Sequence, residues 1–198
     1  MHVCITGPKT CPPEIGGIEV FAYELGKRLA AQGVKVSLVT HRRGGQQRSE
    51  MVKGIEVLRV FGVEGRYSLK LSMIPGLLRA TKSLDPDVVH ANDATSSFAA
   101  SMAFGRRSLV TMHGLVFSKE DWPTPFRQGI RLLQTLAMKN AGAVTATDWT
   151  TAATLKDHFS NIYVLPGGVD TEIFKKGAMP RPAVFGADRI VAILAGSL

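Results

Sequence analysis

Gly16 and Gly17 are the residues of this 198-residue chain whose type and position point most directly to chemistry. They lie between a β-prone run at residues 2–6 and a segment, 18–29, in which apolar residues recur every three or four positions, as on one face of a helix. The glycines therefore occupy a strand-to-helix loop, where free N–H groups bind anions and glycine lets a phosphate approach the backbone. The alternative is that the pair only makes a tight turn, because two glycines are a weak phosphate signal.

Alternating strand and helix patterns position this loop. Ile18, Phe21, Leu25 and Leu29 form the apolar stripe of the first helix, which is expected to end at Gly33. Further β-prone runs lie at 34–40, 55–61, 88–91, 108–112, 143–147 and 162–165, and further helical patterns at 73–84, 96–104, 126–137 and 149–158. This alternation predicts an α/β fold, a Rossmann-like, doubly wound parallel sheet of about seven strands with helices on both faces.

Polar and glycine residues gather where the predicted strands end. Parallel sheets bind ligands beyond the carboxyl ends of their strands, so these residues are expected to share one site. The groups are Gly16-Gly17, Asn92-Asp93, His113-Gly114, Asp148 and Gly167-Gly168-Asp170. Asp148 also suits the N-cap position of the helix that follows it. Residues 41–53, which are polar, basic and glycine-bearing, are expected to form a mobile loop.

Composition narrows the class of protein. A hydrophobic content of 45% with 20% charged residues is typical of a globular domain. No apolar run reaches the ~18 residues that a membrane span needs, and Cys4 and Cys11 do not make a disulfide framework, so a cytoplasmic location is expected. The net charge of +8 indicates an anionic partner, which is a nucleotide phosphate, a nucleic acid or an anionic membrane surface.

The ordered series of these motifs resembles the N-terminal, acceptor-side domain of the GT-B glycosyltransferases, of the glycosyltransferase family 4 type. The resemblance runs along the whole chain. It is carried by Gly16-Gly17-Ile18-Glu19, by 87–93 (Asp-Val-Val-His-Ala-Asn-Asp), by 111–114 (Thr-Met-His-Gly), by 141–147 and by 164–174. The resemblance implies transfer of a sugar from a UDP-, GDP- or ADP-sugar to a sugar or lipid-linked acceptor, with retention and without a metal or cofactor, in polysaccharide or glycolipid biosynthesis.

The resemblance also implies roles for single residues. The Gly16 and Gly17 amides are expected to face the donor diphosphate, and His113 is the expected catalytic residue beside the donor sugar. Its alternative is a strand-end residue packed under its loop. Asn92, Asp93 and Glu19 are the expected acceptor-binding residues, although Glu19 also suits a helix first turn, where it stabilises the dipole by ~0.3–1 kcal/mol. His90, within a buried strand, is expected to be a satisfied core histidine.

Two departures from the family pattern bear on the domain organisation. Gly167 stands where the family has an asparagine before Gly168-Val169-Asp170. Residues 1–174 are expected to form the GT-B N-terminal domain, and 175–198 an interdomain linker and the first strand of a C-terminal donor-binding domain. A truncated product and a natural split protein both fit, and in either case the chain alone is expected to be inactive.

Three other functions remain open. A dinucleotide-binding dehydrogenase domain would have G-x-G-x-x-G and an acid after the second strand, where this chain has Thr40-His41. A nucleic-acid-binding module would interleave aromatic residues with its basic ones or show a helix-turn-helix pattern; this chain has neither, so nucleic acid is not an expected partner. A non-catalytic Rossmann-like scaffold is the third.

Residues 66–82 interleave Arg66, Lys70, Arg79 and Lys82 with apolar residues. This pattern suits either a crossover helix or peripheral contact with anionic lipid at the inner face of a membrane.

Overall fold

The computed structural model describes residues 1–14, 16–65, 68–114, 123–172 and 174–175. The chain divides into two units, Met1–Pro166 and Gly167–Leu198, and each is described by itself. The predicted linker and final strand at 176–198 lie outside the described residues.

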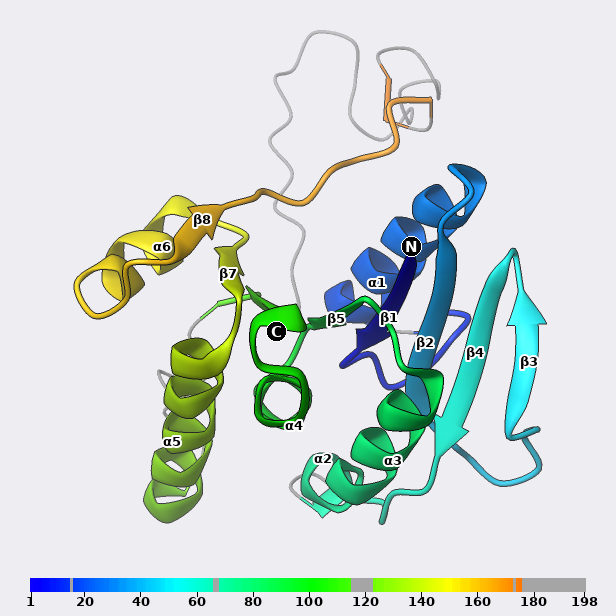
Figure 1. The fold of residues 1–198 in the computed structure, drawn as a ribbon, viewed down its shortest axis with the longest axis horizontal. Helices are drawn as coiled ribbons and strands as arrows, with labels where there is room; N and C mark the ends of the chain where they lie inside the picture. Colours follow the sequence, from blue (N-terminus) through cyan, green and yellow to red (C-terminus); the bar gives the residue numbers. More distant parts are fainter. Residues whose placement is uncertain (15, 66–67, 115–122, 173, 176–198) are drawn as a thin grey trace, which may run out of the picture. The chain divides into compact units, whose positions relative to one another are not determined.

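The first unit alternates strands and helices, as the sequence predicts (Figure 1). Its strands are β1 (His2–Thr6), β2 (Lys35–His41), β3 (Ser49–Val52), β4 (Ile55–Val60), β5 (Val88–Ala91), β6 (Ser108–Met112), β7 (Ala143–Ala146) and β8 (Ile162–Val164). Its α-helices are α1 (Gly17–Ala31), α2 (Ser68–Ser72), α3 (Ile74–Leu84), α4 (Ala94–Phe104), α5 (Thr124–Asn140) and α6 (Trp149–Lys156), and a 3-10 turn spans Gly105–Arg107.

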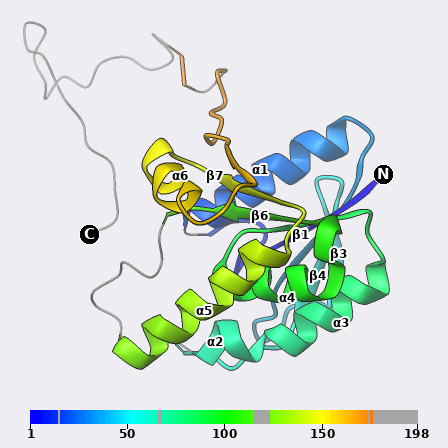
Figure 2. The same ribbon diagram turned by 60° about the vertical axis from the view of Figure 1, so that its left-hand side comes forward.

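The strands form one eight-stranded sheet in the order β3-β4-β2-β1-β5-β6-β7-β8. Every neighbouring pair is parallel except β3–β4, which is antiparallel. The predicted doubly wound α/β fold is therefore confirmed. Helix α1 lies on one face of the sheet, and α2, α3, α4 and α5 lie on the other (Figure 2).

Alternate residues of the central strands pack against these two layers. Val3 and Ile5 of β1 belong to the apolar cluster under α1, whereas Cys4, between them, packs in the cluster under α3. Because both faces are covered, six of the seven residues of β2 are buried, as expected for a strand in the middle of a parallel sheet.

Helix α1 is confirmed, but its most buried side differs from the predicted stripe. The buried residues are Glu19, Ala22 and Gly26, and the stripe of Ile18, Phe21, Leu25 and Leu29 is only half-buried beside them. Gly26 explains the shift, because a Cβ there would lie 2.9 Å from Cδ1 of Ile55. The missing side chain lets the helix approach the sheet on that side.

The prediction of a mobile loop at 41–53 is wrong for His41, which ends β2, and for residues 49–52. β3 pairs with β4 through a two-residue turn at Lys53-Gly54, whose φ angles of 50° and 83° are both positive. Two consecutive residues with positive φ form the turn type whose twist matches a β-hairpin. The strand escaped prediction because its polar edge position leaves only Val52 as a partly buried apolar residue.

Among the described residues, no helix combines the length and the apolar character needed to cross a bilayer.

Candidate functional site

The predicted site residues of the first unit collect at one edge of the sheet. β1, β5 and β6 are neighbours in the sheet and run parallel, so the loops after them meet at their carboxyl ends. Gly16 and Gly17 come from the first loop, Asn92 and Asp93 from the second, and His113 from the third.

The N-terminus of α1 is open. Gly16 is its N-cap, and within the described part of the chain no side chain caps it. The first helical bond that this residue accepts comes from the Val20 N–H, at 3.3 Å, so the amides of the first turn before it have no partner inside the helix. These N–H groups, together with the positive end of the helix dipole, form a place for an anion.

The two glycines of this loop differ in what surrounds them. Gly16 has φ 112°, a conformation that favours glycine, and a Cβ on it would collide with the Glu19 carboxylate. Gly17 is exposed, has no positive φ, and a Cβ on it would meet nothing within 4 Å. Gly16 is therefore required by the loop itself, whereas Gly17 leaves free space in front of the backbone.

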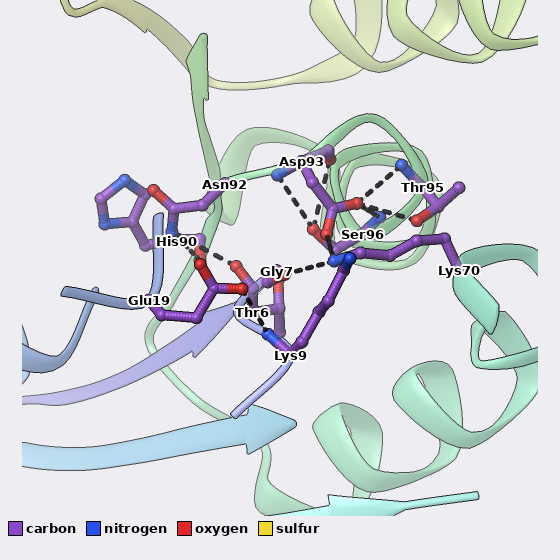
Figure 3. A network of polar contacts seen from close by, with 10 residues as sticks. All are labelled: Thr6, Gly7, Lys9, Glu19, Lys70, His90, Asn92, Asp93, Thr95 and Ser96. Carbon is purple, nitrogen blue, oxygen red and sulfur yellow. Dashed lines mark hydrogen bonds and ion pairs between the residues drawn. The ribbon is translucent and has the colours of Figure 1, made fainter. Parts of the chain in front are cut away.

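Glu19 lies in the first turn of α1, as predicted, but it is buried, with only 8% of its surface exposed. Its Oε1 accepts a hydrogen bond of 3.1 Å from the Lys9 N–H (Figure 3). The carboxylate thereby joins the loop after β1 to the start of α1. It also acts on the electrostatics of His113, described next.

His113 is held by Asn92. The Asn92 amide donates from Nδ2 to the carbonyl of Thr6, at 3.2 Å, so its Oδ1 faces the histidine. The His113 Nε2 is 3.0 Å from this oxygen and must therefore carry the proton, which leaves Nδ1 as a hydrogen-bond acceptor. Phe21 packs edge-on against the imidazole, with ring centroids 4.9 Å apart.

The protonation state of His113 follows from its surroundings. Burial lowers the pKa of His113 below its ordinary value, while the carboxylates of Asp93 and Glu19 act in the opposite direction. The net shift is downward, so the ring is neutral at physiological pH. A neutral ring in a fixed tautomer can accept a hydrogen bond from a substrate hydroxyl at Nδ1.

Asp93 closes the N-terminus of α4. Its Oδ1 accepts from the Thr95 N–H at 2.9 Å and from the Ser96 N–H at 3.0 Å. The Asp93 N–H in turn donates to Ser96 Oγ, which completes a capping box. Its Oδ2 lies 2.6 Å from the Lys70 ammonium. Burial raises the pKa of this carboxyl, but the ammonium and these hydrogen bonds outweigh it, and the pKa lies below the ordinary value.

Lys70 was not predicted as a site residue. It comes from α2, and besides Asp93 its Nζ donates to the carbonyl of Gly7 at 2.5 Å (Figure 3). Sequence patterns place Lys70 only among the basic residues of 66–82. A lysine in an amphipathic segment gives no sign of facing inward, so only the structure could place it here.

His90 is a satisfied core residue, as expected. Its Nε2 lies 2.6 Å from Thr111 Oγ1, which in turn lies 2.7 Å from Thr145 Oγ1. Burial lowers the pKa of His90 to about 4, with a smaller effect from His113, so the ring is neutral.

Asp148 caps α6, as predicted, through a 2.7 Å hydrogen bond from the Thr151 N–H. Gly167, Gly168 and Asp170 belong to the second unit, where the Asp170 carboxylate accepts from the Glu172 N–H at 3.0 Å.

The acceptor role predicted for Asn92, Asp93 and Glu19 stays a prediction. In the structure all three side chains form hydrogen bonds within the protein. Among the described residues, no three His, Cys, Asp or Glu side chains converge in a group that could hold a metal ion.

Comparison with known proteins gives one family. The model of the family described as Glycosyltransferase Family 4 matches residues 15–173. The D-inositol 3-phosphate glycosyltransferase of Acidothermus cellulolyticus is 29% identical over 213 residues, which cover 91% of this chain and 47% of that protein. The enzyme of the same name from Stackebrandtia nassauensis is 27% identical over 189 residues, covering 83% of this chain and 42% of that protein. The chain thus spans about half the length of these relatives.

Solved structures show the same fold. Sucrose-phosphate synthase from Thermosynechococcus elongatus matches with a TM-score of 0.72 at 18% identity, covering 87% of this chain and 49% of that one. Anabaena Alr3699/HepE, solved in complex with UDP and glucose, matches with a TM-score of 0.61 at 15% identity, covering 88% of this chain and 46% of that one. At such identities the likeness concerns the fold alone, which is that of one half of a GT-B glycosyltransferase.

Proposed function

The chain belongs to Glycosyltransferase Family 4, and on this premise we propose that it is the acceptor-side half of an enzyme that transfers a sugar from a nucleotide diphosphate sugar to an acceptor hydroxyl. The open N-terminus of α1, beside a histidine fixed in one tautomer, is the observation that carries the proposal. The reaction is proposed to be retaining and to need no metal or other cofactor. A UDP-, GDP- or ADP-sugar is the proposed donor.

The first step depends on the leaving group. As the bond from the sugar to the donor phosphate lengthens, negative charge grows on the phosphate oxygens. The uncapped amides at Gly17 and the following residues, with the helix dipole, are aimed at such charge before the reaction begins. Preorganised donors of this kind lower the barrier because they need no reorientation as charge develops.

The second step concerns the sugar and the acceptor. We assign the unprotonated Nδ1 of His113 to a hydroxyl of the donor sugar, which it orients while positive charge develops at the reacting carbon. The acceptor oxygen attacks on the face that the phosphate leaves, and its proton passes to the departing phosphate oxygen. Asn92 holds the imidazole in the required tautomer.

The names of the relatives suggest which acceptors to test first. Because the relatives are D-inositol 3-phosphate glycosyltransferases, a phosphorylated cyclitol is the first acceptor to test, followed by sugar and lipid-linked acceptors. The donor-binding half, in cis or in trans, is a proposed partner. Without it the chain is expected to transfer sugar too slowly to be useful, since positioning both substrates contributes ~7–11 kcal/mol to such reactions.

Two glycine variants test the proposal in a protein that joins this chain to a donor-binding half. Gly17→Val places a side chain in front of the open amides where the fold leaves space, so transfer is expected to fall while the melting temperature is unchanged. Gly16→Val is expected to lower both, because φ 112° and the Glu19 carboxylate oppose a side chain there. Unchanged kcat/KM in a folded Gly17→Val variant would remove the loop from catalysis.

A peripheral membrane contact is the second proposal, at the inner face of a cytoplasmic membrane. Around α2 and its preceding loop, Phe61, Val63 and Leu71 expose 71%, 50% and 40% of their surfaces. Lys70, however, points inward to Asp93 and is not available to lipid. Arg79 and Lys82 of α3 are exposed and are the described cations of this segment that remain for an anionic headgroup.

A further inference from the structure

Lys70 occupies an unusual place for a lysine on a short surface helix. Only 25% of its side chain is exposed, and 14% of that of its partner Asp93. Removing two charges from water is costly, and an apolar pair of similar size is often no less stable. Stability alone therefore does not explain a largely buried ion pair at this place.

The Lys70 ammonium joins two segments that flank Asn92. One contact, 2.5 Å long, goes to the carbonyl of Gly7, the first residue after β1. The other, 2.6 Å long, goes to Asp93, the residue after Asn92 and the N-cap of α4. Figure 3 shows Lys70 reaching Gly7 and Asp93 from α2.

These two segments already touch at Asn92. Gly7 has φ 115°, and a Cβ on it would lie 3.0 Å from the Asn92 Cβ and 3.1 Å from the Asn92 backbone. Asn92 also donates to the Thr6 carbonyl from its backbone N–H, at 3.0 Å, and from its side-chain amide. A small displacement of either segment would therefore move the Asn92 amide, and with it the oxygen that binds His113.

We infer that Lys70 is a positioning residue for His113, because its ammonium ties the loop after β1 to the N-cap of α4 on either side of Asn92, the residue that holds the imidazole. This inference deepens the proposed function, on which its catalytic meaning rests. Helix α2 thereby becomes part of the site without touching the donor. Any ligand or surface that moves α2 acts on His113 through this contact.

The pair also sets the charge around the imidazole. The acidic groups that act on His113 are Glu19 from α1 and Asp93 from the start of α4, while His90 on β5 is neutral. Lys70 balances Asp93. Removing the lysine leaves an unbalanced carboxylate that favours the imidazolium, whereas removing the carboxylate's charge disfavours it, so the two halves of the pair act on the pKa of His113 with opposite signs.

Nuclear magnetic resonance of the imidazole nitrogens in the ¹⁵N-labelled 198-residue chain tests this inference without any transfer assay. We expect the Nε2–H tautomer in the unmodified chain. Lys70→Met is expected to raise the pKa of His113 and to weaken the tautomer preference, and Asp93→Asn is expected to lower that pKa, each by about 0.5 or more. Lys82→Met, an exposed lysine of the neighbouring helix, is the matched control and should change neither.

Asp93→Asn keeps the test decisive if Lys70→Met does not fold, since asparagine caps a helix as well as aspartate does. If the pair only stabilised the fold, the melting temperature would fall in both variants while His113 kept the Nε2–H tautomer preference of the unmodified chain, whatever pKa shift the changed charge produced. That result, or shifts of the same sign in the two variants, would overturn the positioning role. Because the measurement observes the His113 imidazole directly, its result does not depend on whether the chain takes part in sugar transfer.

Discussion

Two helix N-termini that follow neighbouring strands, α1 after β1 and α4 after β5, are built in opposite ways. α1 begins at Gly16, with no side-chain cap among the described residues and an exposed glycine next to it. α4 begins at Asp93, whose carboxylate accepts from two backbone amides and pairs with Lys70. The protein thus satisfies the first amides of α4 with its own side chain and, among the described residues, leaves those of α1 without a side-chain cap.

The difference separates the tasks at this edge of the sheet. The closed end is the N-terminus of α4, where Asn92, Asp93 and Lys70 fix the neighbouring loops. The open end is the N-terminus of α1, and we propose that it faces the negative charge that the reaction generates. His113 lies between them, fixed by Asn92 on one side and packed on Phe21 of α1 on the other.

The largest effect is expected at His113, where the two sides meet. His113→Ala removes the acceptor at Nδ1 and should lower kcat in a protein that joins this chain to a donor-binding half by about 10²–10³-fold, as loss of one preorganised group does. His158→Ala, at an exposed histidine after α6, is the matched control. Equal losses in both variants would mean that His113 acts only through the fold.

The second largest effect is expected from acid, which lowers the free energy of unfolding by protonating His90 on β5, the strand that precedes the closed end. His90 has a folded-state pKa of about 4 against an ordinary 6.5, so the unfolded chain takes up a proton first as the pH falls. Stability from this residue is present above pH 6.5 and is lost between pH 6.5 and 4, by about 3 kcal/mol at pH 4. Chemical denaturation at several pH values measures it. His90→Gln should flatten this part of the curve, and an unchanged slope would show that His90 does not titrate as described.

Removing the cap of α4 should cost more than removing that of α6. Asp93→Ala loses an N-cap and leaves the Lys70 ammonium without its carboxylate, a loss of about 2–3 kcal/mol. Asp148→Ala removes only a solvent-exposed cap, with no buried cation left behind, so its loss of stability is expected to be smaller. Urea denaturation of both variants gives the comparison, and equal losses would mean that the Lys70 pair contributes nothing to stability.

The smallest effect concerns the membrane. Flotation of the chain with anionic vesicles should exceed that with neutral ones, and Arg79→Gln or Lys82→Gln should each lower binding about fivefold, since a cation near such a surface contributes about 1 kcal/mol. Lys70→Gln should not add to this loss, because Lys70 faces Asp93. Equal recovery on both vesicle types, or none on either, would leave the charge of +8 without a lipid partner.

Much of this arrangement could be predicted because it depends on local patterns. Apolar alternation located the strands other than β3, and Asp148 before a helical run predicted its cap. The edge strand at 49–52 was missed because its pairing depends on a turn with two positive φ angles, not on hydrophobic residues. The inward direction of Lys70 was also missed, since it follows from Gly7 and Asp93, which are distant in sequence.

The contrast between the two helix N-termini is tested most directly by titrating the ¹⁵N-labelled chain with UDP, GDP and ADP at millimolar concentrations. We expect at least one of them to shift the amide signals of Gly17, Ile18 and Glu19 at the open end, while those of Thr95 and Ser96 at the capped end stay in place. Shifts at Thr95 and Ser96 without shifts at α1, or no shift at either helix with any of the three, would contradict it.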